Sequence, residues 1–180
     1  MHGPASPGWL LVALCAATGA YCLLRMRSGV EEQRSAAGGE ALMGFGMAAM
    51  AVPPAVFTPP GWAWPVYAAV FGAAALRALW SARAGAHHLH HLVGAGAMVY
   101  MAAVMAGTPA HAHGHGSAGV PLLTGALLAY FTAYVLLAGA RLLPAAAAGG
   151  AAVAWGDRPE VARACRLSMG IGMLAMLLTM

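Results

Sequence analysis

The methionines of this chain repeat in a pattern that could bind a metal ion. The motif M-G-x-G-M-x-A-M occurs at residues 43–50 and again at residues 169–176. On an α-helix, where successive residues turn by about 100°, the three methionines of each copy share one narrow face. Thioether sulfur is a soft ligand that favours Cu(I) over hard cations such as Mg²⁺. The motif therefore predicts two helices that carry stripes of Cu(I) ligands.

A third segment combines a methionine stripe with histidines on the same face, and a separate loop contains three more histidines. We expect the loop to collect the ion and the stripes to hold or pass it. Two of the histidines and Cys165 would receive the ion at the cytoplasmic end, where imidazole and thiol replace thioether. The predicted metal ligands are Met43, Met47, Met50, His87, His91, Met98, Met101, Met105, His111, His113, His115, Cys165, Met169, Met173 and Met176.

The same residues allow a second interpretation, in which no ligand binds. Methionine is a flexible filler of irregular cores, and glycine in a membrane helix lets a neighbouring backbone approach closely. The M-G-x-G-M motif would then only pack helices, in a structural or assembly protein. Cys15, Cys22 and Cys165 lie in or beside apolar runs and are expected to pack as small hydrophobic residues. The histidines of residues 87–91 could likewise face solvent or lipid headgroups.

Catalysis finds no support among the sequence motifs. The chain lacks the G-x-S-x-G, H-E-x-x-H and phosphate-binding glycine patterns, and it has only five acidic residues. Neither a hydrolase triad nor a pair of catalytic carboxylates can be assembled from them. We therefore predict that the protein is not an enzyme.

Composition places the candidate ligands in a membrane. Of the 180 residues, 61% are hydrophobic and only 8% are charged, and several apolar runs are long enough to cross a bilayer. The net charge of +4 is explained by nine arginines in short loops, which orient membrane helices, so we reject nucleic-acid binding. The chain is predicted to be a multi-pass protein of the plasma membrane. Its partners would be the lipid bilayer and, as an open alternative, a second copy or another membrane protein.

Hydropathy and turn signals predict an all-α fold with six transmembrane helices in a single domain, residues 1–180. Residues 28–39 are expected to form a solvated loop or a frayed helix end, and Pro53-Pro54 to kink or end the second helix. The second, fourth and sixth helices, which carry the methionine stripes, are expected to run in the same direction, so the chain is predicted to form three hairpins. The predicted helices are residues 9–24, 40–57, 62–80, 87–106, 120–143 and 158–180.

Charge distribution predicts the orientation of these helices. With the N-terminus outside, all nine arginines and all five acidic residues lie at cytoplasmic ends, while the outer loops carry only histidine. Alignment of the two motif copies also places Glu40 and Arg166 three residues before the first methionine of each copy. We expect these two side chains to pair, because pairing lowers the cost of desolvating charges at the membrane edge.

Four segments also carry a resemblance to a known family. They are P-G-W-L-L at residues 7–11, the motif of residues 40–50, H-H-L-H-H-L at residues 87–92 and C-R-L-S-M-G-I-G-M at residues 165–173. With these segments the chain resembles, over nearly its full length, an uncharacterised family of actinobacterial integral membrane proteins with a domain of unknown function. The resemblance implies a multi-helix membrane protein and brings no activity, ligand or site.

Overall fold

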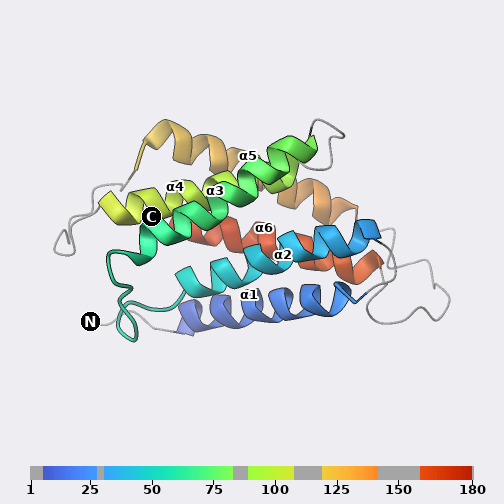
Figure 1. The fold of residues 1–180 in the computed structure, drawn as a ribbon, viewed down its shortest axis with the longest axis horizontal. Helices are drawn as coiled ribbons and strands as arrows, with labels where there is room; N and C mark the ends of the chain where they lie inside the picture. Colours follow the sequence, from blue (N-terminus) through green and yellow to red (C-terminus); the bar gives the residue numbers. More distant parts are fainter. Residues whose placement is uncertain (1–5, 28–30, 83–88, 108–118, 142–158, 180) are drawn as a thin grey trace. The chain divides into compact units, whose positions relative to one another are not determined.

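The computed structural model describes residues 6–27, 31–82, 89–107, 119–141 and 159–179, and within these ranges it contains six α-helices and no strand (Figure 1). Each helix has 19 or 20 residues, which at 1.5 Å per residue is about the 30 Å thickness of the bilayer's hydrocarbon core. The all-α prediction is confirmed. The helices are α1 (Ser6–Arg25), α2 (Glu31–Met50), α3 (Ala63–Ala82), α4 (Leu89–Gly107), α5 (Pro121–Ala140) and α6 (Pro159–Leu178).

Five of these helices, α1, α3, α4, α5 and α6, are long and apolar enough to cross a membrane. The chain is therefore a multi-pass membrane protein. Helix α2 is not apolar enough over its described residues to be such a candidate, because its first turns hold Glu31, Glu32 and Arg34. Its apolar part begins only after Glu40, although the helix itself is as long as the others.

The predicted limits of the second helix are wrong at both ends. It starts at Glu31 instead of residue 40, because residues 31–39 include good helix formers such as Glu, Gln, Arg and Ala and because Ala37 is buried in the core. It ends at Met50 instead of residue 57, while the expectation that Pro53-Pro54 would kink or end it is confirmed, since the residue before a proline disfavours helix. The other five helices agree with their predicted limits to within three residues at either end.

The chain forms two compact units. The first comprises Met1–Val56 and Leu128–Thr179, which include α1, α2, α6 and the second part of α5. Within it, α1 packs along α2, and both contact α6. The second unit comprises Phe57–Leu127, with α3 packed along α4 and the first part of α5.

Glycines of the repeated motif lie where helices of the first unit touch, as the packing interpretation predicted. A Cβ atom on Gly44 would lie 2.9 Å from both Cα and N of Gly19, so only glycine permits this approach of α2 to α1. In the second copy, a Cβ on Gly170 would lie 3.0 Å from Cγ2 of Val135 on α5. Gly96 on α4, by contrast, has no atom within 4 Å of its Cβ position among the described contacts.

In the second unit, the Tyr100 hydroxyl on α4 forms hydrogen bonds with groups at the start of α5. Its hydroxyl accepts a hydrogen bond from the Val120 backbone N at 2.9 Å and lies 2.7 Å from Oγ1 of Thr124. Gly119 has a φ of 120°, and a Cβ at this position would overlap the Tyr100 hydroxyl. Glycine is thus required here both for its backbone conformation and for the close approach of the tyrosine.

Candidate functional site in the first unit

One face of α1 carries polar and sulfur side chains into the core of the first unit. Cys15, Thr18, Cys22 and Arg25 follow one another at steps of three or four residues and so share a face of the helix. All four are buried, with exposed fractions of 2%, 5%, 0% and 4%. From the sequence, the two cysteines were expected to pack as small hydrophobic residues. They are indeed buried, but they belong to a row with a hydroxyl and a guanidinium.

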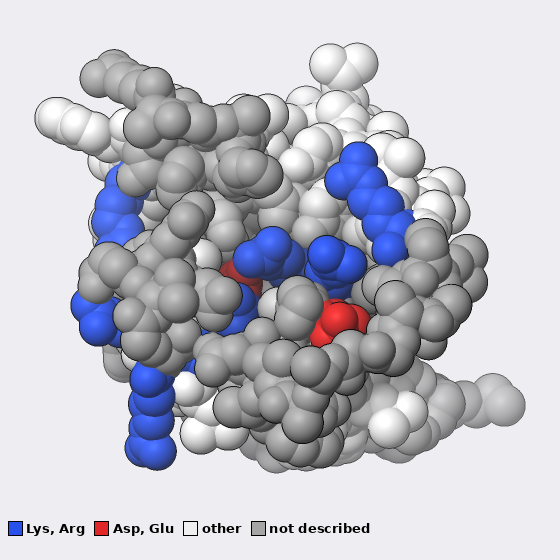
Figure 2. Space-filling view, turned by 90° about the vertical axis from the view of Figure 1, so that its right-hand side faces the viewer, with Lys and Arg blue, Asp and Glu red and all other residues white. Residues whose placement is uncertain are grey.

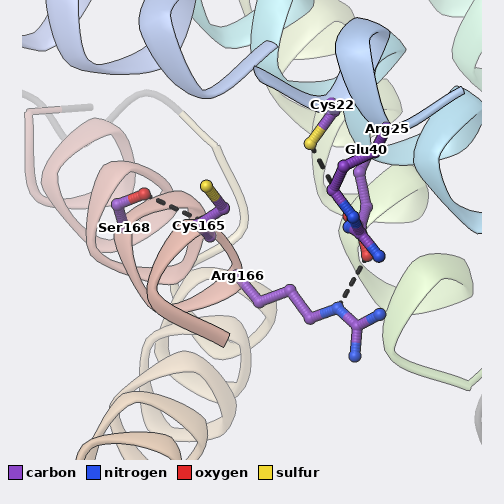
Figure 3. A network of polar contacts seen from close by, with 6 residues as sticks. All are labelled: Cys22, Arg25, Glu40, Cys165, Arg166 and Ser168. Carbon is purple, nitrogen blue, oxygen red and sulfur yellow. Dashed lines mark hydrogen bonds and ion pairs between the residues drawn. The ribbon is translucent and has the colours of Figure 1, made fainter. Parts of the chain in front are cut away.

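The row ends in a cluster of charges around Glu40 of α2, whose side chain is completely buried (Figure 3). Its Oε2 atom accepts a hydrogen bond from Nη1 of Arg25 at 2.7 Å, and its Oε1 atom accepts one from Nε of Arg166 at 2.7 Å. The Cys22 thiol donates to Oε2 at 3.6 Å. The predicted pairing of Glu40 with Arg166 is therefore confirmed. Arg25 is a second partner that the sequence analysis missed, although its position three residues after Cys22 on the same face was a usable signal.

Hydroxyl groups link α1 to α6 farther from the charged cluster. Thr18 Oγ1 donates to the Leu14 carbonyl oxygen at 2.8 Å and lies 3.2 Å from Oγ of Ser168. Ser168 Oγ in turn donates to the Cys165 carbonyl oxygen at 2.9 Å. These polar groups satisfy one another inside the membrane-spanning part, where an unpaired hydroxyl would be costly.

Two buried sulfur atoms lie close to a glycine of the second motif copy. The Cβ position of Gly172 on α6 lies 3.4 Å from Sγ of Cys15 on α1 and 3.6 Å from Sδ of Met47 on α2. Both sulfur-bearing side chains are buried, Cys15 with an exposed fraction of 2% and Met47 of 0%. A thiol and a thioether from different helices thus approach the same point because glycine leaves the space beside α6 free.

The other predicted ligands divide between the two units. In the first unit Met43, Met169, Met173 and Met176 are buried, whereas Met50 and Cys165 are half-buried. In the second unit Met98 and Met101 are buried, His91 is half-buried and Met105 is 40% exposed. Most of the methionine stripes therefore face protein and not lipid. His87, His111, His113 and His115 lie outside the described residues.

No group of three or more His, Cys, Asp or Glu side chains that could hold a metal ion exists among the described residues. The receiving site predicted from His87, His91 and Cys165 includes His87, which lies outside the described part of the chain.

The charged side chains of the first unit gather at one of its ends. Arg25 ends α1, Glu40 and Arg34 lie in the first half of α2, and Arg163 and Arg166 lie in the first turns of α6. Figure 2 looks onto this end, where arginine side chains lie beside acidic ones. The opposite ends of α1, α2 and α6 have no charged residue in their described parts.

Comparison with known proteins identifies the family of the chain. A family model described as a domain of unknown function, DUF5134, matches residues 32–180. No curated protein matches the chain, and no solved structure does. The match begins within α2 and so does not include the row of buried residues on α1.

Proposed function

We propose that this chain, which belongs to the DUF5134 family of domains of unknown function, is a plasma-membrane protein that binds a soft metal ion such as Cu(I) in its first unit. The observation that supports the proposal best is the approach of Cys15 Sγ and Met47 Sδ to Gly172. Binding, with transport or sensing of the ion as its purpose, is proposed in place of an enzymatic reaction.

The donor atoms of this site fit Cu(I). Cysteine and methionine sulfurs are soft ligands that select Cu(I) over harder divalent ions. Cys15 would lose its proton on binding, so the thiolate would offset the charge of the ion. Two other buried methionines of the same unit are candidates for a further thioether ligand. Met43 lies four residues before Met47, and Met173 directly follows Gly172.

The orientation that we propose has the N-terminus outside and the six helices arranged as three hairpins. It is supported by the charged end of the first unit, since arginines concentrate on the cytoplasmic side of membrane proteins. His111, His113 and His115 would then lie outside, where they could capture the ion before it reaches the sulfur ligands.

Cu(I) titration of the purified protein in detergent, against a chromogenic Cu(I) chelator, tests the proposal. We expect a Cys15→Ser, Met47→Leu double variant to bind Cu(I) at least about tenfold more weakly than wild type, because both soft ligands are lost. Met26→Leu is the matched control, since Met26 is 39% exposed in the same unit and is not among the predicted ligands. Equal binding by the double variant and wild type, or no binding by either, rejects the metal site.

A structural role is the second candidate, and the contact of Gly44 with Gly19 favours it specifically. In that case the motif would hold α1, α2 and α6 together, or prepare them for a second copy or another membrane protein. The titration separates the two functions, because a packing motif predicts no Cu(I) binding at any chelator concentration.

A further inference from the structure

The charged cluster around Glu40 has more positive than negative charge. Two guanidinium groups, from Arg25 and Arg166, contact one carboxylate at 2.7 Å each. Arg25 and Glu40 have side-chain exposed fractions of 5% and 0%, so water screens them little. The remaining positive charge is therefore not neutralised by the acidic residue of the cluster.

Arg166 is the member of the cluster that can reach a ligand. Its side chain is 41% exposed, whereas that of Arg25 is almost fully buried. Its Nε atom is held by Glu40, and the two terminal nitrogens point away from the carboxylate (Figure 3). A guanidinium fixed in this way presents a planar pair of donors, which is the geometry that binds phosphate oxygens.

The cluster lies at the edge of the membrane. Arg25 is the last residue of the candidate span Pro7–Arg25, and Arg166 is within two turns of the start of the span Glu160–Leu178. An arginine at this depth can extend to the level of the headgroups. Basic sites between membrane helices at this level are suited to anionic headgroups.

We propose that the outward edge of Arg166, held in place by Glu40, binds a phosphate group, either of an anionic phospholipid or of free phosphate. The phosphate neutralises the excess charge of the cluster and accepts hydrogen bonds from the terminal nitrogens of Arg166. This site is independent of the proposed metal site, since it shares no residue with it.

Lipid selectivity of the full chain in nanodiscs tests the site. Electron paramagnetic resonance would compare the association of spin-labelled phosphatidylglycerol with that of spin-labelled phosphatidylcholine. We expect the anionic lipid to be enriched about fivefold, the effect of one well-placed arginine. Arg166→Gln should remove most of this enrichment. Arg163→Gln, which removes an exposed charge one turn earlier on α6, should leave most of it.

Inorganic phosphate distinguishes the two sources of the ligand. Broadening of its ³¹P resonance by the wild type in neutral detergent, lost in Arg166→Gln, would show that free phosphate also binds. The proposal is overturned if the wild type neither enriches phosphatidylglycerol nor broadens the phosphate signal, or if Arg163→Gln has as large an effect as Arg166→Gln. The wild-type measurements alone can therefore reject the site, even if Arg166→Gln does not fold.

Discussion

At the residue scale, Glu40 holds the charged end of the first unit together, and we expect its loss to be costly. Glu40→Gln removes the charge that pairs with Arg25 at 2.7 Å, and the Arg25 side chain is only 5% exposed. Leaving a buried arginine unpaired should lower the free energy of unfolding by about 3–5 kcal/mol. Unfolding in mixed micelles of mild detergent and dodecyl sulfate, followed by near-ultraviolet circular dichroism, measures the change.

The matched control is Glu160→Gln, which removes an exposed carboxylate in the first turn of α6. It should cost only about 0.3–1 kcal/mol, the usual contribution of an acidic group at a helix start. If both variants were destabilised equally, Glu40 would not have the role given to it here.

At the element scale, the contact between α1 and α2 depends on glycine, and Gly44→Ala should disturb it. The new Cβ would lie 2.9 Å from backbone atoms of Gly19, which cannot rotate away as a side chain could. Overpacking of this kind should lower the free energy of unfolding by about 1–3 kcal/mol in the same micelle assay. Gly39→Ala, in the same helix with nothing within 4 Å of its Cβ position, should be neutral or stabilising by up to about 1 kcal/mol. A loss of stability in Gly39→Ala as large as in Gly44→Ala would contradict this account.

The elements also show where inference from the sequence succeeds and where it stops. Apolar length and proline positions predicted five helices closely, and the repeated motif placed Glu40 level with Arg166, because each signal is local. The start of α2 was missed, since its polar turns carry no hydropathy signal and are ordered by helix propensity and the burial of Ala37. The approach of Cys15 to Met47 was missed as well. It depends on how α1, α2 and α6 cross, and no spacing within one helix records that.

At the scale of the whole molecule, the function depends on which side of the membrane the charged end of the first unit faces. Arginines in short loops favour the cytoplasm, so both termini should be outside and residues 28–39, 81–86 and 144–160 inside. We expect an impermeant maleimide to leave cysteines introduced at Ser35 and Ala147 unmodified in intact cells and to label them in opened membranes. Val56→Cys is the control that should react in intact cells, because Val56 is 63% exposed in the turn after α2, at the opposite end of that helix from its charges.

Labelling of the Ser35 or Ala147 variant in intact cells would show that the topology is the inverse of the proposed one. The loop histidines would then face the cytoplasm, and the Glu40 cluster would lie at the outer leaflet. Capture of the ion from outside would be excluded, while the sulfur and phosphate sites could still be tested by themselves.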